Sequence, residues 1–398
     1  MEDDARTEDR PPAPLVAGDI DGDRLWKHLE ESCAWARHAR PAGAEEALRY
    51  VMSRLGAWGV AATVHECDVY APPSEAHPEG DWRRLRFPVA NVAPDGGSAL
   101  FVLVGGHGDA SLLELARVFH LRRNELKHGL RIAWWNGGGE IGFGAAAGYA
   151  DSHFDLLRSR CLSYLNVDRL ADRTLTRYRP CATAELADWV RDVLRRRAGQ
   201  EADPTPLPGD ADASFLGVGL PSFSFLPVSG ARDVGEMGRD RLTAHTAFYA
   251  EALYELAARE RAPLDLMAVA DVFWGELEVL SGETGDAFDL GQVKEAVKEL
   301  VVVLEDHEEE HAGLEPGVFN RKMLDICHLI NPVLYTERGP YGHDPGGSGG
   351  VLPTLRRARR LAGLDPEGPE ARRLRAQLVR ARTRVCDMTS RAILVART

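Results

Sequence analysis

The sequence of 398 residues has no long hydrophobic run, and its six cysteines are scattered without any Cys-x-x-Cys pair. Without an apolar run of bilayer length, a membrane-spanning helix is not expected. The isolated cysteines exclude a disulfide framework and a thiolate zinc site, so we expect a reducing, cytoplasmic setting. The acidic, Pro-rich start of the chain indicates a disordered leader over residues 1–21 rather than a signal peptide.

Positive charge is also scarce. Lys and Arg number 48 against 61 Asp and Glu, which gives a formal net charge of −13. This balance argues against a general nucleic-acid binder, whose affinity depends on neutralising phosphates. The hydrophobic share of 44% and the charged share of 27% are typical of a globular protein, and the length accommodates two domains.

Apolar strand-like runs alternate with amphipathic helical segments along most of the chain. The strand-like runs are 60–70, 98–106, 130–135, 161–168 and 221–228, and the helical segments are 22–58, 111–126, 145–160, 182–199 and 246–261. A polar, Pro-rich connection covers residues 71–86. Continuous apolar strands separated by helices predict an α/β fold with a mostly parallel sheet flanked by helices, over residues 22–264.

Residues 265–398 have an all-helical pattern with two opposed charge blocks. Residues 271–315 hold fourteen Asp or Glu against two Lys, whereas residues 355–398 hold twelve Arg against four Asp or Glu. Two interpretations remain open. The blocks are either separate amphipathic helices with solvated faces, or helices that pack together in a bundle within or between chains.

Several potential ligands follow successive strands of the predicted sheet. His107, Asp109, Glu140 and Asp168 come after successive strand-like runs, Asp210 and Asp212 precede the run 221–228, and His245 lies in the loop after that run. In an open parallel sheet, ligands bind beyond the carboxyl ends of the strands. Histidine nitrogen and carboxylate oxygen are common zinc ligands. The pattern therefore favours a metal-type or acid/base site at this edge.

A dinucleotide site is the competing interpretation of one stretch. Gly137, Gly139 and Gly142 satisfy G-x-G-x-x-G. That fingerprint normally follows the first strand of its unit and has an acidic residue about 20 positions further on. Here two strand-like runs come earlier, and Asp168 lies 26 residues after Gly142. The nucleotide interpretation is therefore disfavoured.

The order of these motifs resembles the zinc aminopeptidase family that also contains glutamate carboxypeptidase, glutaminyl cyclase and the transferrin receptor. The resemblance covers about residues 25–398 and rests on "HGD", "SYLNVD", "GVGLPSFSF" and "AHTAF". The segment "FNRKMLDICHLINPVLYTERGPYGHDP" is similar to the transferrin-receptor-like dimerisation domain. The resemblance therefore implies a helical dimerisation domain over 265–398 and a homodimer.

Carried over residue by residue, the resemblance implies metal ligands at His107, Glu140, Asp168 and His245, with Asp109 orienting the first histidine. The family's general-base glutamate falls on Gly139, which cannot accept a proton. The loop that carries the family's metal-bridging aspartate is missing, because "HGDASLLELAR" runs directly into a helix. A pair of zinc ions without a shared anionic ligand is disfavoured, so the expectation is one zinc ion or none.

Two functions follow from this altered motif set. The first is a degenerate or retuned hydrolase or acyl-transfer catalyst on small peptide or amide substrates, with Glu140 or Asp212 as a replacement base. The second is a non-catalytic, dimeric binding or scaffold protein on the same fold. Neither interpretation includes a nucleic-acid or membrane partner.

Overall fold

The structure is a computed structural model that describes residues 16–36, 41–71, 80–106, 109–135, 144–167, 175–208, 211–229, 238–344 and 350–398. Seven strands form one sheet in the order β1-β2-β4-β3-β5-β7-β6. They are β1 (Ala61–Ala71), β2 (Asp81–Val92), β3 (Phe101–Gly106), β4 (Gly129–Trp134), β5 (Cys161–Asn166), β6 (Leu175–Ala182) and β7 (Ser222–Ser229).

The sheet is mixed, which corrects the expectation of a mostly parallel one. The four central strands β4, β3, β5 and β7 are parallel to one another. Strand β2 joins β4 antiparallel, β1 pairs antiparallel with β2, and β6 pairs antiparallel with β7. The central strands are the apolar runs expected from the sequence, whereas antiparallel strands extend the sheet on both sides.

The sequence pattern missed β2 and β6, the two strands that carry both arginines and a proline. Pro88 lies in β2 and Pro180 in β6. Proline cannot donate to a strand ladder, so it is confined to edges, strand starts and bulges. Strand β6 is an edge strand, and the register of β2 with β4 begins at Val89, one residue after Pro88. Each proline thus lies where its strand is hydrogen-bonded to a neighbouring strand on one side and not on the other.

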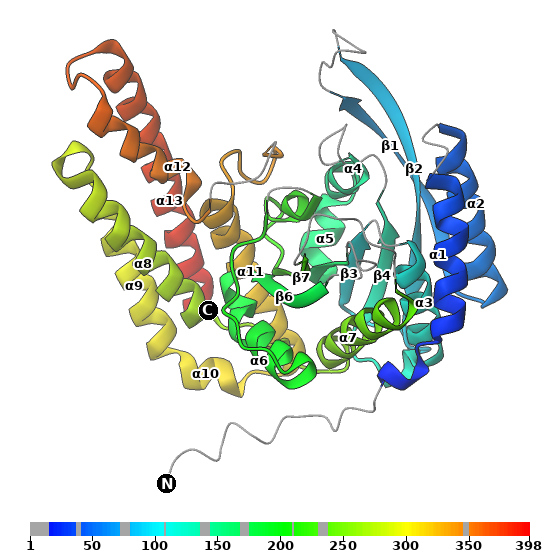
Figure 1. Ribbon diagram of the computed structural model, residues 1–398. Coiled ribbons are helices and arrows are strands. Elements are labelled where there is room, and N and C mark those ends of the chain that lie inside the picture. Colours follow the sequence, from blue (N-terminus) through cyan, green and yellow to red (C-terminus); the bar gives the residue numbers. More distant parts are fainter. Residues whose placement is uncertain are drawn as a thin grey trace.

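Helices cover both faces of the sheet. They are α1 (Gly22–Ala36), α2 (Pro41–Ala57), α3 (Asp109–Leu121), α4 (Gly144–Ser152), α5 (Phe154–Arg160), α6 (Ala187–Ala198) and α7 (Arg239–Ala257). Side chains of a strand alternate between faces. Val102 and Val104 of β3 accordingly join the core of α1, α2, α3, α6 and α7, while Phe101 and Leu103 join that of α4 and α5. In Figure 1 the helices α1 and α2 lie beside the long β1–β2 hairpin.

The chain before α1 contributes to this core. A short 3-10 turn, η1 (Val16–Asp19), contacts α7. Val16 is fully buried, and the backbone N–H of Ala17 donates to Glu251 Oε1 at 2.7 Å. Residues 16–21 are therefore part of the fold rather than of the expected leader.

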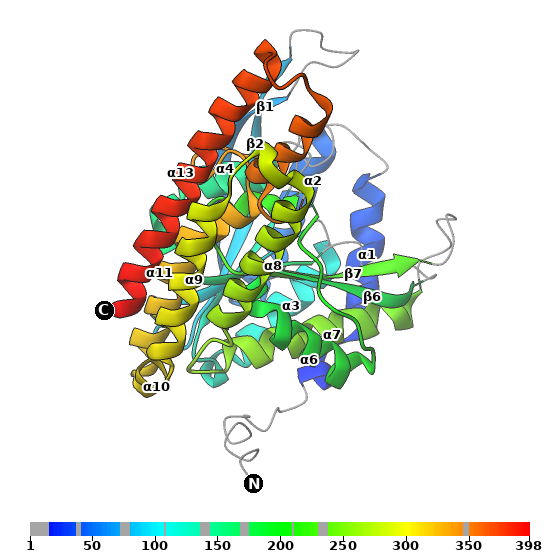
Figure 2. The ribbon, with the colours of Figure 1, turned by 90° about the vertical axis from the view of Figure 1, so that its left-hand side faces the viewer.

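The C-terminal part is helical. Its elements are α8 (Leu266–Thr284), η5 (Gly285–Ala287), α9 (Gly291–Asp306), α10 (Glu308–Gly313), α11 (Pro316–Tyr335), α12 (Pro353–Arg356), η6 (Arg357–Gly363) and α13 (Pro369–Arg397). Figures 1 and 2 show α8, α9 and α13 extending as an arm on one side of the sheet. Among the described helices, none combines the length and the apolarity needed to cross a membrane.

The acidic and basic blocks pack together within one chain, which decides between the two interpretations of these segments. Helix α13 contacts α9, and η6 contacts α8. Three ion pairs join the blocks at 2.6, 2.5 and 2.8 Å: Glu276 with Arg356, Glu283 with Arg359, and Glu299 with Arg397. The apolar stripe of α9, which includes Val293 and Val297, is buried beneath them.

A buried carboxyl group connects the sheet region to the C-terminal helices. Glu185 lies in the 3-10 turn η3 (Ala184–Leu186) and is fully buried. Its Oε1 accepts from the hydroxyl of Thr183 at 2.8 Å and from Nδ2 of Asn331 in α11 at 2.7 Å. No cation pairs with this group among the described residues, and burial raises the pKa of Glu185 above its ordinary value.

Candidate functional site

Three parallel strands end side by side at the edge where the site is expected. Gly106 at the end of β3 pairs with Trp134 at the end of β4, and Gly105 pairs with Asn166 at the end of β5. His107, Gly139, Glu140 and Asp168 follow these ends in the sequence and lie outside the described residues. Asp109 begins α3 and Asp212 lies in η4 (Ala211–Phe215), each described by its backbone alone.

The strand ends approach one another so closely that β3 must finish in glycine. A Cβ atom on Gly105 would lie 2.0 Å from the indole nitrogen of Trp135, and one on Gly106 would lie 1.8 Å from the carbonyl oxygen of Val167. The backbone N–H of Val167 also donates to the carbonyl of Gly105 at 2.7 Å. The paired glycines of "VLVGG" therefore have a packing role, which fixes where the residues after β3 and β5 leave the sheet.

His245 is the one predicted site residue whose side chain the structure describes, and it lies in a helix. The expectation of a loop position is wrong, because α7 already begins at Arg239, before His245. The side chain is only 6% exposed. Its Nδ1 forms a short hydrogen bond with the hydroxyl of Tyr178 in β6, whose ring meets the imidazole edge-on at 86°.

Burial keeps both members of this pair neutral. It lowers the pKa of His245 to about 4, with a smaller contribution from Arg241, and it raises the pKa of Tyr178. The imidazole Nε2 is buried and has no hydrogen-bond partner among the described residues. If Nδ1 carries the proton, it donates to Tyr178 Oη and leaves the Nε2 lone pair free. That arrangement suits a metal ligand, because metal-bound histidines usually donate their other ring N–H to an orienting group.

A second buried contact ties the His245 segment to the motif after β3. The hydroxyls of Thr246 and Ser111 are 3.0 Å apart and buried. Thr246 is the neighbour of His245, and Ser111 lies in the first turn of α3, two residues after Asp109. The fold thus brings the first turn of α3, which follows "HGD" in the sequence, into contact with the "AHT" segment of α7.

The full ligand set remains a prediction. No group of three or more His, Cys, Asp or Glu side chains that could hold a metal ion occurs within the part of the chain that the structure describes. Four of the predicted residues, His107, Gly139, Glu140 and Asp168, lie outside that part. His245 alone can be assessed as a ligand, and its unpartnered Nε2 fits that role.

Sequence reasoning missed Tyr178, which orients His245. The residue lies on β6, a strand that the pattern did not predict. The signal was present as the alternation Arg177, Tyr178, Arg179, Pro180, in which the arginines are exposed and the two other residues are buried. A period of two is the mark of a half-buried strand, and it places Tyr178 on the inner face.

Comparison with known proteins adds information on the fold. No family model and no curated protein matches the sequence. An aminopeptidase from Aneurinibacillus sp. strain AM-1 superposes with a TM-score of 0.50 at 12% identity, covering 61% of this chain and 95% of that one. A zinc aminopeptidase from Bacillus subtilis gives 0.48 at 11%, covering 61% and 97%. The glutaminyl cyclase of Fimbriiglobus ruber gives 0.49 at 13%, covering 63% and 99%.

The chain therefore shares its fold with the Aneurinibacillus aminopeptidase, which it matches at a TM-score of 0.50. The similarity predicted from the sequence extended over about residues 25–398, whereas the structural matches cover 61–63% of the chain. The transferrin-receptor-like dimerisation domain stays a prediction.

Proposed function

We propose that the chain is a retuned hydrolase of small peptide or amide substrates, with its site at the carboxyl edge of β3, β4 and β5. The observation that carries this proposal is His245, a buried neutral imidazole whose Nδ1 bonds Tyr178 and whose Nε2 has no partner among the described residues. An unpaired buried polar atom costs stability, so it calls for an explanation such as a ligand.

A single zinc ion is the group that best fits this imidazole. His245, together with His107 and Asp168, would hold it, and Glu140 would serve either as a further ligand or as a base. When bound, zinc supplies a Lewis acid that polarises the substrate carbonyl and lowers the pKa of water. The loss of the bridging aspartate makes a second ion at the same site unfavourable.

The reaction requires little of the chain beyond a proton acceptor and correct orientation. Water adds to the amide carbonyl carbon while Glu140 accepts its proton, the C–N bond breaks, and the amine leaves with that proton. Gly139 occupies the position of the general base in the family that the chain resembles, but glycine has no side chain that could accept the proton. General-base catalysis contributes about 10²–10⁴-fold, so an imperfectly placed Glu140 should leave a slow enzyme.

The experiment combines zinc content with turnover of aminoacyl and acidic dipeptide substrates. We expect slow, zinc-dependent hydrolysis that is lost in His245→Ala and retained in His307→Ala, a control far from the sheet edge. His307 is the C-terminal cap of α9, and its Nδ1 bonds the backbone carbonyl of Val303 at 3.0 Å. Tight zinc binding without turnover on any amide substrate would instead support a non-catalytic binding or scaffold protein, the function that Gly139 favours.

We further propose a homodimer formed through the C-terminal helices. In support, this arm presents exposed apolar side chains, which are Val272, Val279, Val302, Val379 and Leu394. Scattered surface valines are ordinary, but an interface needs such residues at its centre. Light scattering at micromolar concentration should give twice the chain mass, and a monomer would contradict the proposal.

A reducing compartment is the setting we propose for this enzyme. The five described cysteines, Cys67, Cys161, Cys181, Cys327 and Cys386, are all free thiols. Buried free thiols are ordinary in reduced compartments, whereas secreted domains tend to pair them.

A further inference from the structure

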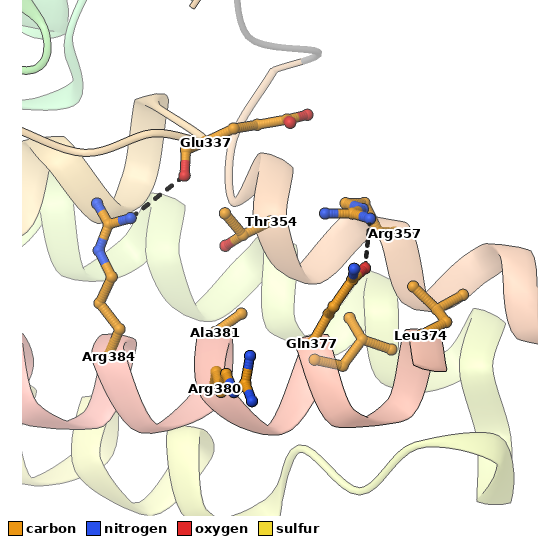
Figure 3. Close-up of a pocket in the computed structure, with 9 residues that line it drawn as sticks. Glu337, Thr354, Arg357, Leu374, Gln377, Arg380, Ala381 and Arg384 are labelled. Atoms are coloured by element: carbon orange, nitrogen blue, oxygen red, sulfur yellow. Dashed lines mark hydrogen bonds between the residues drawn. The ribbon is translucent and has the colours of Figure 1, made fainter. Parts of the chain in front are cut away.

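A groove rich in arginine runs along the C-terminal arm, away from the sheet edge. It lies between α12 and η6 on one side and α13 on the other, and it consists of two adjoining pockets of about 230 and 350 Å³. The pockets share Arg357, Leu374 and Gln377, so they form one continuous groove. Figure 3 shows Gln377 and Arg384 rising from α13 toward Arg357 and Glu337.

The arginines of this region divide into two sets. Those that face the acidic helices, such as Arg356, Arg359 and Arg397, are ion-paired with α8 and α9. The groove set consists of Arg357, Arg360, Arg373, Arg380 and Arg384. The chain thus neutralises the first set with its own acidic block and leaves most of the second set without acidic partners.

The hydrogen bonds of the groove arginines show that few of these side chains have an acidic partner. Arg373 and Arg380 form no hydrogen bond or ion pair with any described residue. Arg384 donates to the backbone carbonyls of Pro332 and Glu337, at 3.1 and 3.3 Å, and desolvation lowers its pKa. Arg357 donates to Oε1 of Gln377 at 2.7 Å.

Carboxylates offset only part of the positive charge. Glu370 pairs with Arg360 at 3.3 Å, and Glu337 is the one other acidic residue of the lining. Crowded guanidinium groups repel one another and hold donors that water alone satisfies. An anionic ligand would reduce the repulsion between the guanidinium groups and would accept hydrogen bonds from their N–H groups.

The spacing along α13 indicates an extended ligand. Residues 373, 377, 380 and 384 recur every three or four positions and therefore lie on one face of the helix. At 1.5 Å rise per residue, they span about 16 Å. The floor between them is apolar, formed by Leu374 and Leu378.

We propose that this groove binds a small, soluble ligand that carries two or more linked phosphate groups. Guanidinium forks match phosphate oxygens in geometry and form strong charge-assisted hydrogen bonds. The pocket volumes suit a small molecule. A long nucleic acid is a poor fit, because the net charge of −13 and the neighbouring acidic helices α8 and α9 repel a polyanion beyond the groove.

The test is calorimetric titration of the full-length protein with inorganic tripolyphosphate. The variant combines Arg373→Gln and Arg380→Gln, two exposed side chains that form no hydrogen bond or ion pair with a described residue. The matched control is Arg391→Gln on the same helix, which removes a side chain paired with Asp387 at 3.2 Å outside the groove. Because the double variant loses two guanidinium groups that can form charge-assisted hydrogen bonds with phosphate, it should bind at least about tenfold more weakly.

Three results would overturn the proposal. These are no heat of binding at millimolar tripolyphosphate and low salt, an equal loss of affinity in the Arg391→Gln control, and tighter binding of a short single-stranded oligonucleotide than of tripolyphosphate. The last result would assign the groove to nucleic acid. None of these measurements depends on the hydrolase site, so failure here leaves the proposed function untouched.

Discussion

Replacing His245 by glutamine should alter the pH dependence of folding stability more than the stability near neutral pH. The imidazole is 6% exposed, and its environment lowers the pKa from the ordinary 6.5 to about 4. Glutamine keeps a polar side chain that can still bond Tyr178, but it does not titrate. The comparison therefore isolates the proton that His245 binds on unfolding.

The sign and size of the effect follow from these two values. A histidine with a lowered folded-state pKa stabilises the fold above its unfolded value of 6.5, and this contribution is lost as pH falls toward about 4. As pH falls from about 7.5 to about 5, the unfolded state binds a proton that the folded state does not bind, which lowers the free energy of unfolding by about 2 kcal/mol. The His245→Gln variant should not show this loss.

Urea titrations of both proteins at the two pH values, with a metal chelator present, measure the difference. Other buried histidines, such as His28 and His128, titrate alike in both proteins and cancel in the comparison. A gap between parent and His245→Gln that stays constant within about 0.5 kcal/mol would refute a buried, neutral imidazole.

Three further predictions concern the fold around the site. Because burial raises the pKa of Glu185 in the folded state, the protonated carboxyl stabilises the fold. This contribution to folding stability is complete below the ordinary carboxyl pKa and is lost as pH rises through the raised pKa of the folded state. Glu185→Gln should therefore gain stability relative to the parent as pH rises, and a pH-independent difference in urea titrations would contradict this. Gly106→Ala should lower the free energy of unfolding by at least about 1–3 kcal/mol, because the added Cβ would collide with the Val167 carbonyl. Gly96→Ala, where an added Cβ has no atom within 4 Å, should change it by less than about 0.5 kcal/mol. Equal shifts of the thermal midpoint in the two variants would refute the packing argument. Tyr178→Phe should cost about 1–3 kcal/mol by stranding a buried imidazole nitrogen, and an unchanged urea midpoint would show that the hydrogen bond is dispensable.

The sequence allowed the central sheet to be predicted, because buried parallel strands are continuous apolar runs. "LFVLVGG" and "LRIAWW" became β3 and β4, with Arg131 as the single polar side chain in the two runs. The antiparallel strands β2 and β6 were missed, since Pro88 and the arginines of both strands resemble a loop composition. Their pairing depends on neighbours distant in the sequence, which a local pattern does not reveal.

The candidate site was predictable by residue type but not by arrangement. His245 was identified from its motif, yet its helical position and its bond to Tyr178 depend on where α7 begins and on the missed strand β6. The Glu185–Asn331 contact was not foreseen either, because the two residues are 146 positions apart. Tertiary contacts of this kind carry no periodic signal.

The zinc content of the purified protein tests the central claim most directly. After exposure to excess zinc and removal of the free metal, the parent protein should retain a single tightly bound ion per chain. His245→Ala should lose that ion with its helical circular dichroism unchanged, while His307→Ala should keep it. No zinc in the parent protein, or equal zinc in His245→Ala, would contradict a metal site at the carboxyl edge of the sheet.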